Sequence, residues 1–273
     1  MVSRTGTLVY VPGSSGSGGQ GPQRSLVWVN RQGKEEPIKA PIRAYTYPRL
    51  SPDGSRLALD VRDQENDIWI WDLARETLTR LTFDATTDSF PVWTPDSRRV
   101  IFASARAGAS NLYWQAADGT GAAERLTTSS NVQDAYSMSP DGTRVVLRET
   151  AQNKTGQDIH QLVLEPSTGR EAGQLRAQPL IQTTFSERNG EVSPDGRWLA
   201  YESDESGQFQ IYVRPFPKVD AGRWQVSTGG GTRPPVSRTR ERRRRLQDGA
   251  SASPTLSGRG CSRGQVGARP RFP

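Results

Sequence analysis

The sequence contains very little cysteine and histidine, and this shortage excludes several classes of site. Its 273 residues include one cysteine, Cys261, and one histidine, His160. One cysteine cannot form an intrachain disulfide or a cysteine metal cluster. The sequence also has no Walker loop, no His-Glu-x-x-His and no Cys-x-x-Cys motif. We therefore expect no catalytic residue, no metal ligand, no cofactor and no enzymatic activity in this chain.

Long hydrophobic runs are absent as well. No segment approaches the roughly 18 apolar residues that a membrane-spanning helix needs. Residues 1–20 lack the charged start and apolar core of a signal peptide. We expect no membrane segment, and the sequence leaves the compartment unassigned.

Positive charge is concentrated at the C-terminal end. Residues 233–273 contain eleven arginines against Glu241 and Asp248, a net charge of +9, whereas the whole chain carries +7 and the rest therefore −2. The near-neutral part gives no reason to expect binding to nucleic acid or anionic lipid. A nucleic-acid contact would have to come from residues 237–273.

What the sequence does contain is a repeated turn motif. It occurs as Ser51-Pro52-Asp53-Gly54, Thr94-Pro95-Asp96-Ser97, Ser139-Pro140-Asp141-Gly142 and Ser193-Pro194-Asp195-Gly196. Proline presets the backbone for a type I turn, aspartate accepts hydrogen bonds from nearby backbone N–H groups, and glycine allows a left-handed conformation. Each motif therefore predicts two strands joined by a tight hairpin. The apolar runs that follow, such as Leu57-Ala58-Leu59, predict strands buried on both faces.

The spacing of these turns predicts a β-propeller. They recur at intervals of 43, 45 and 54 residues, a period in which four short strands form one blade. We expect an all-β propeller of four-stranded blades over residues 1–236. Its blades are expected at about 1–47, 48–90, 91–134, 135–188 and 189–231, and the first lacks its first strand.

Residues 237–273 do not continue the repeat. After Arg233 the sequence consists mostly of Arg, Pro, Gly, Ala and Ser, and the apolar strand expected after a sixth turn is missing. We expect a disordered, Arg-rich tail, and the abrupt loss of the repeat favours a frameshift near residue 235. The alternative is an evolved basic arm that binds nucleic acid or acidic lipid.

Three local patterns formally match sites, and their context argues against each. Gly16, Gly18 and Gly21 match the dinucleotide-binding fingerprint, but a strand follows them where that motif needs a helix. The acidic loop Asp63–Asp67 lacks the spacing of a calcium loop. Asn153-Lys154-Thr155 is a glycosylation acceptor of a kind that is common by chance.

His160 is the remaining candidate, as a general base or a metal ligand. The repeat aligns it with the aromatic residues Trp69, Tyr113 and Tyr212 of other third strands. We therefore expect His160 to fill a packing position in a third strand.

The repeat resembles that of a known propeller family. Ser193-Pro194-Asp195-Gly196 followed by Leu199-Ala200-Tyr201, together with the ending Arg80-Leu81-Thr82, is similar to the WD-repeat-like propeller of TolB-type proteins, over residues 1 to about 236. Residues 63–80 and 212–233 more specifically resemble the C-terminal propeller of bacterial serine/threonine protein kinases. The kinase motifs His-Arg-Asp and Asp-Phe-Gly are absent, so the resemblance implies no kinase activity for this chain.

The family pattern implies six blades, of which this chain supplies about five. Residues 232–237 would add one inner strand. That strand either pairs with the first blade and closes the ring, or the ring stays open and exposes a strand edge.

Three functions are compatible with such a propeller. The first is a non-catalytic, monomeric binding or scaffold module that recognises a protein, peptide or glycan. The second is the sensor propeller of a bacterial serine/threonine kinase, which would place it outside the cytoplasm. The third is the accessory propeller of a serine peptidase. The sequence assigns neither the ligand nor the binding face.

Overall fold

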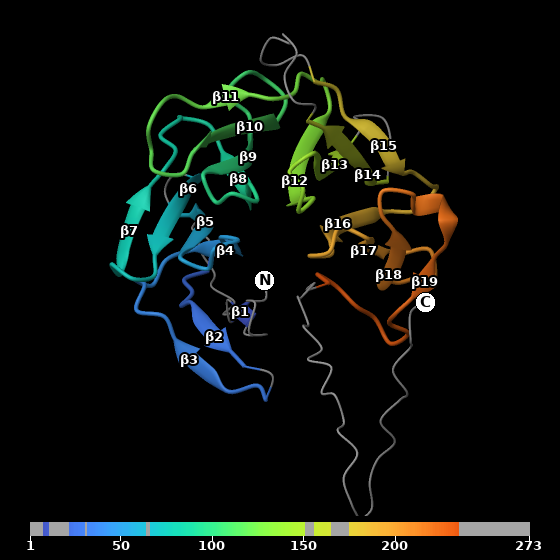
Figure 1. Ribbon diagram of the computed structural model, residues 1–273, viewed down its shortest axis with the longest axis horizontal. Helices are drawn as coiled ribbons and strands as arrows, with labels where there is room; N and C mark the ends of the chain where they lie inside the picture. Colours follow the sequence, from blue (N-terminus) through green and yellow to red (C-terminus); the bar gives the residue numbers. More distant parts are fainter. Residues whose placement is uncertain are drawn as a thin grey trace, which may run out of the picture. The chain divides into compact units, whose positions relative to one another are not determined.

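The computed structural model is almost entirely β-structure. It describes residues 8–10, 22–30, 32–63, 66–150, 156–164 and 175–234. Within these ranges the strands form four four-stranded sheets and one three-stranded sheet, each a meander of consecutive antiparallel strands (Figure 1). The predicted all-β propeller built from four-stranded blades is confirmed. The expected tail, residues 237–273, lies outside the described residues.

We number the four-stranded sheets as blades 1 to 4. Blade 1 contains β4 (Tyr45–Leu50), β5 (Arg56–Arg62), β6 (Asn66–Asp72) and β7 (Thr77–Arg80). Blade 2 contains β8 (Asp88–Trp93), β9 (Arg99–Ser104), β10 (Asn111–Ala116) and β11 (Glu124–Arg125). Blade 3 contains β12 (Val132–Met138), β13 (Arg144–Thr150), β14 (Asp158–Val163) and β15 (Gln178–Ile181). Blade 4 contains β16 (Glu187–Val192), β17 (Trp198–Ser203), β18 (Gln210–Pro215) and β19 (Trp224–Gln225), with the 3-10 turn η1 (Val219–Ala221) before β19.

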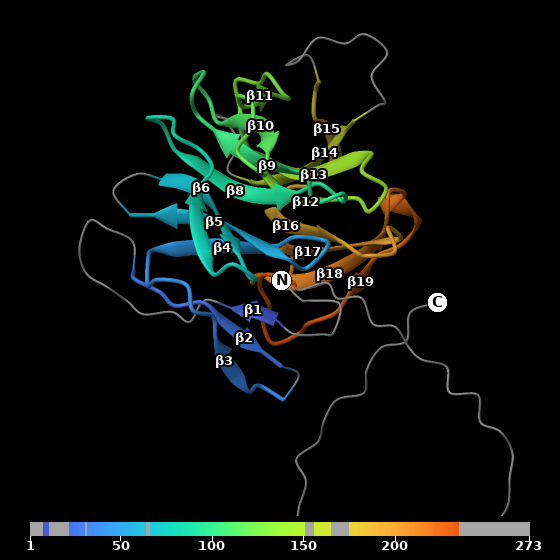
Figure 2. The ribbon, with the colours of Figure 1, turned by 60° about the vertical axis from the view of Figure 1, so that its left-hand side comes forward.

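The three-stranded sheet precedes blade 1 and is called the N-terminal sheet. It contains β1 (Leu8–Tyr10), β2 (Val27–Val29) and β3 (Glu35–Pro37). Leu26 and Ile38 of this sheet region pack with Tyr45 and Leu50 of blade 1. Figure 2 shows the N-terminal sheet beside β4.

The four turn motifs form hairpins between the first and second strands of the blades. In blade 3 the Ser139 hydroxyl donates to Asp141 Oδ1 at 2.5 Å and accepts the Arg144 N–H at 2.9 Å. Gly142 N donates to Ser139 O at 2.9 Å. Gly142 has a φ of 74°, in the left-handed region that the motif predicts. Ser97, which replaces the glycine in blade 2, adopts the same conformation with φ 60°.

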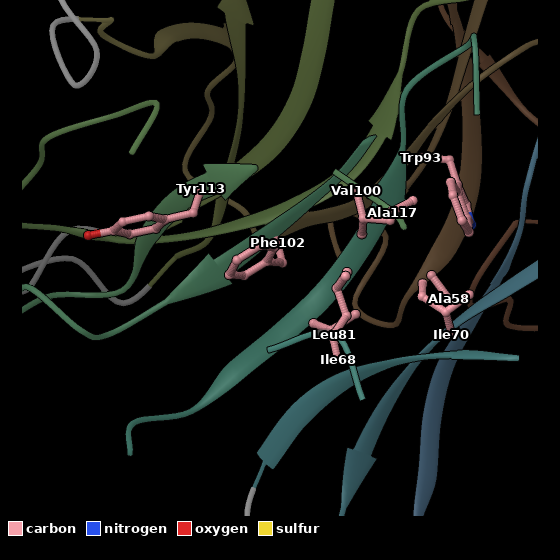
Figure 3. Close-up of a cluster of buried hydrophobic side chains, with 9 residues drawn as sticks. All are labelled: Ala58, Ile68, Ile70, Leu81, Trp93, Val100, Phe102, Tyr113 and Ala117. Carbon is pink, nitrogen blue, oxygen red and sulfur yellow. The ribbon is translucent and has the colours of Figure 1, made fainter. Parts of the chain in front are cut away.

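Adjacent blades pack through the apolar faces of their middle strands. Figure 3 shows one such interface, where blade 1 contributes Ala58, Ile68, Ile70 and Leu81 and blade 2 contributes Trp93, Val100, Phe102, Tyr113 and Ala117. Leu57, Ala58 and Leu59 are fully buried, which confirms that this strand is covered on both faces. Since each fully buried large apolar side chain contributes about 1.5–3 kcal/mol, these interfaces hold the blades in order.

The first strand of each blade is longer than the sequence suggested and is interrupted by a bulge. β4, β8, β12 and β16 begin at residues 45, 88, 132 and 187, two or three residues before the expected blade starts. In β4, Thr46 pairs with Asp60 and Arg49 with Ala58, so that Tyr47 and Pro48 together face one residue of β5. The same interruption occurs in β8, β12 and β16. A bulge adds one residue to a strand and redirects its side chain, and pairing with the second strand continues upstream of it.

The expected inner strand at residues 232–237 is not formed by the part of it that the structure describes. Residues 232–234 belong to no strand, and among described residues β1 pairs with β2 alone. Residues 235–237 lie outside the described ranges.

Candidate functional site

The first strands of blades 1 to 4 surround a cavity. These strands, β4, β8, β12 and β16, are the innermost of their blades (Figure 1). The cavity has a volume of about 490 Å³. Its lining residues are Tyr47, Phe90, Tyr136, Arg148, Gln157, Arg188, Asn189, Glu202, Thr232 and Arg233. Every blade therefore contributes to one shared site.

The bulges supply the cavity walls. Tyr47, Phe90 and Asn189 are the bulge residues of β4, β8 and β16, and they adopt positive φ values of 45°, 54° and 53°. Arg233 also lines the cavity with φ 53°. Such conformations cost about 1–3 kcal/mol in non-glycine residues and gather at functional sites. All four of these residues line the cavity.

Aromatic rings form one side of the cavity. The rings of Tyr47 and Phe90 lie 4.4 Å apart between centroids. The guanidinium of Arg233 lies 4.9 Å from the Tyr47 ring, and that of Arg148 lies 6.0 Å from the Phe90 ring. Stacked aromatic and guanidinium groups give flat contact area together with positive charge.

Two acid–arginine pairs occupy equivalent positions in blades 3 and 4. Asp134 of β12 pairs with Arg148 of β13. In blade 4 the order is reversed, because Arg188 lies on β16 and its partner Glu202 lies on β17, with Nε and Oε2 2.7 Å apart. Burial raises the pKa of the Asp134 carboxyl, and the charge of Arg148 opposes that rise.

Glu202 connects blade 4 to the segment that follows it. Its other oxygen, Oε1, accepts a hydrogen bond from Asn189 Nδ2 at 2.7 Å and another from the backbone N–H of Arg233. Glu202 is fully buried. The carboxylate thus fixes Arg233 at the edge of the cavity.

Arg49 joins three inner strands on the side of the turn motifs. From β4 its guanidinium forms an ion pair with Glu191 of β16 and donates to the Tyr136 carbonyl oxygen of β12 at 2.7 Å. Arg49 and Glu191 lie closer to the turns than the bulge residues do. These contacts hold together the inner strands of blades 1, 3 and 4.

Exposed apolar side chains stand at the ends of the blades remote from the turns. Ile42, Phe83 and Phe185 lie in the connections that lead into β4, β8 and β16, and Val132 begins β12. Each inner strand runs from such a connection to its turn motif. Each inner strand is therefore preceded by, or begins with, one exposed apolar residue at the end of the blades remote from the turns.

Two buried polar atoms of the cavity make no hydrogen bond within the described residues. They are Arg148 Nε, a donor, and Gln157 Oε1, an acceptor. Unsatisfied buried groups of this kind cost about 1–3 kcal/mol each. They are therefore candidate contacts for a ligand.

The structure places His160 and the acidic loop outside the cavity. His160 is buried in β14, opposite Leu147, the position equivalent to that of Trp69 opposite Leu59. Asp63 pairs with Arg43 at 2.6 Å, and Asp67 pairs with Arg80 at 2.7 Å.

Several sequence candidates lie outside the described residues. They are Gly16, Gly18 and Gly21, the triplet 153–155 and Cys261. Within the part of the chain that the structure describes, no group of three or more His, Cys, Asp or Glu side chains could hold a metal ion. No helix in that part is long and apolar enough to cross a membrane.

The cavity residues do not follow from the turn repeat in the sequence. A signal was present, because Tyr47-Pro48 and Phe90-Pro91 stand at the same distance before their turns. Proline in a strand indicates an edge or a bulge. Asn189-Gly190 occupies the same position in blade 4 without a proline.

Comparison with known proteins agrees with this architecture. Residues 30–176 match the TolB beta propeller domain. TolB from Acinetobacter baumannii superposes with a TM-score of 0.64 at 16% identity, covering 82% of this chain and 54% of that one. A putative TolB from Agrobacterium tumefaciens gives a TM-score of 0.58 at 19% identity over 72% of this chain and 67% of that one. These two likenesses concern the fold alone.

Among curated proteins, the uncharacterized peptidase YuxL of Bacillus subtilis is 27% identical over 213 residues, which are 63% of this chain and 32% of YuxL. The chain spans about a third of the length of the curated relatives that it matches. The family match covers more than half of the 273 residues. Together with the blades described above, it shows that the chain belongs to the TolB beta propeller domain family.

Proposed function

We propose that this chain is a non-catalytic binding propeller that takes a segment of a partner protein into its central cavity. The observation that supports this is the set of bulges that direct side chains from four separate blades into one space. Ligand sites are commonly cavities of 300–1,000 Å³ with apolar walls and a few placed polar groups. The exposed apolar residues at the ends of the blades remote from the turns favour a protein partner over a free small molecule, because such surfaces mark interaction sites.

Peptide binding can be tested by selection from a displayed random peptide library, followed by titration of the selected peptides. We expect Tyr47→Ala to weaken binding at least tenfold, since the ring supplies much of the aromatic wall. Trp114→Ala, on β10 and outside the cavity, is the matched control and should leave binding unchanged. Recovery of no peptide, or equal binding by both variants, would contradict the proposal. Binding of glycans instead of peptides on the same cavity would reassign the ligand.

A second candidate function is that of the accessory propeller of a serine peptidase. The likeness to YuxL, a protein described as a peptidase, favours it. In that case a hydrolase domain would be encoded beside this propeller, and the cavity would contact its substrates. Sequencing the transcript on both sides of the coding region tests this directly, because a hydrolase domain in frame would support it.

The resemblance to kinase-attached propellers gives the remaining proposal, a sensor whose ligand biases an upstream kinase. It rests on residues 63–80 and 212–233. The same transcript would then encode a kinase domain before this chain. We also propose that the chain is a monomer, which light scattering after size-exclusion chromatography can check.

A further inference from the structure

The cavity carries one positive group that no acid of the described residues neutralises. Three arginines and one glutamate line it. Arg148 pairs with Asp134, and Arg188 pairs with Glu202. The guanidinium of Arg233 lies over the Tyr47 ring, and the structure gives it no ion pair within the described residues. A ligand that complements this site therefore carries a negative charge.

The two unsatisfied buried atoms restrict the chemistry further. Arg148 Nε needs an acceptor and Gln157 Oε1 needs a donor. A fully ionised phosphate or sulfate offers acceptors only. The end of a peptide offers both, because its carboxylate and carbonyl oxygens accept while its N–H groups donate.

The contacts of Arg49 limit how a peptide can enter. Arg49 joins β4 to β16 and β12 nearer to the turns than the bulge residues, so a continuous strand of a partner would have to displace these contacts to pass through the ring. A chain end fits this geometry better than a loop does. Of the two chain ends, the carboxylate matches Arg233 and the amine does not.

We infer that the cavity recognises the C-terminal carboxylate of a peptide, with Arg233 as its charge partner and with Arg148 Nε and Gln157 Oε1 bonding the adjacent peptide groups. Tyr47, Phe90 and Tyr136 would contact the last side chains. This inference rests on the proposed peptide-binding function and adds the group that is recognised.

The test uses two matched sets of random hexapeptides, one with a free C-terminal carboxylate and one with a C-terminal amide. Affinity selection with the full chain, followed by fluorescence anisotropy, measures binding of each. We expect the free acids to bind about tenfold more tightly or better, as a charge-assisted hydrogen bond provides. Arg233→Gln should remove this preference, and Arg233→Lys should retain part of it.

Arg197→Gln is the matched control, because Arg197 is exposed and pairs with Asp195 at a turn. It should keep the full preference for the free acid, and circular dichroism melts should show all three variants folded.

Equal binding of acids and amides would overturn the carboxylate inference while leaving peptide binding intact. Peptide amides with an internal Asp or Glu that bind as tightly as the free acids would show that the cavity does not recognise the C-terminus. Inorganic phosphate that competes for the cavity as strongly as the peptide would lead to the same conclusion. Absence of binding by both sets would overturn the proposed function itself.

Discussion

At the scale of single residues, Glu187 at the start of β16 is the most perturbed carboxyl group outside the cavity. It is 1% exposed, and its Oε1 accepts a hydrogen bond from the Thr183 hydroxyl at 2.5 Å. Its Oε2 is buried without a partner within the described residues. Burial, followed by the charges of Asp158 and Asp204, raises the pKa of Glu187 from 4.5 to about 7.

This pKa predicts a loss of stability as the pH rises. The folded protein retains the Glu187 proton up to about pH 7, whereas the unfolded chain releases it near pH 4.5. The free energy of unfolding therefore falls between these values. In the wild type, the free energy of unfolding should fall as the pH rises from 5 to 8. We expect Glu187→Gln to make this fall smaller by roughly 2 kcal/mol, as measured by urea unfolding. Glu36→Gln, on the exposed strand β3, should unfold like the wild type at both pH values, and the same result for Glu187→Gln would contradict the assignment.

At the scale of elements, the bulge in β16 is packed more tightly than a side chain permits. A Cβ atom on Gly190 would lie 2.8 Å from Val146 Cγ1 and 3.4 Å from Ile159 Cδ1. Val146 and Ile159 are fully buried in blade 3. Gly190 O also accepts the Ser137 hydroxyl at 2.8 Å. The absence of a side chain at residue 190 is what lets β16 approach blade 3.

We therefore predict that Gly190→Ala destabilises the protein by about 1–3 kcal/mol through overpacking. Gly229→Ala is the control, because nothing lies within 4 Å of its added Cβ atom and its φ is not in the left-handed region. It should change the free energy of unfolding by less than about 0.5 kcal/mol. Chemical denaturation of the two variants measures the difference, and equal stabilities would show that blade 3 yields to the added methyl group.

At the scale of the whole propeller, the pair Arg49–Glu191 connects blades 1 and 4 directly. The two side chains are 15% and 19% exposed. The residues are 142 positions apart in the sequence. Because the pair is mostly buried, removing one partner leaves the other charge without compensation.

A double-mutant cycle with Arg49→Met and Glu191→Gln tests this connection. We expect each single substitution to destabilise the protein and the coupling energy to be about 1–3 kcal/mol. The exposed pair Arg197–Asp195 within blade 4 should give a coupling of no more than about 1 kcal/mol. If the losses of unfolding free energy in the two single variants simply add in the double variant, the ion pair does not hold the two blades together.

The fold was predictable because its signals are local. The hydroxyl of Ser139, the carboxylate of Asp141 and the positive φ of Gly142 act within six residues of one another. Turn chemistry of this kind specifies a hairpin wherever it occurs. The apolar runs between the turns then indicate which strands are buried. The regular spacing of the turns indicates that the strands form repeated blades. Sequence alone therefore determined the all-β class, the turns and the place of His160 in a third strand.

The cavity was decided only by the tertiary structure. Tyr47, Phe90, Tyr136 and Asn189 come from four blades, and each stands at a bulge that shifts the strand register by one residue. A shift of one residue moves a side chain to the other face of a strand. The prolines after Tyr47 and Phe90 indicate an irregular strand, but they do not show which side chains point inward. Their proximity depends on how successive blades pack around one another, and that packing is a property of the folded chain.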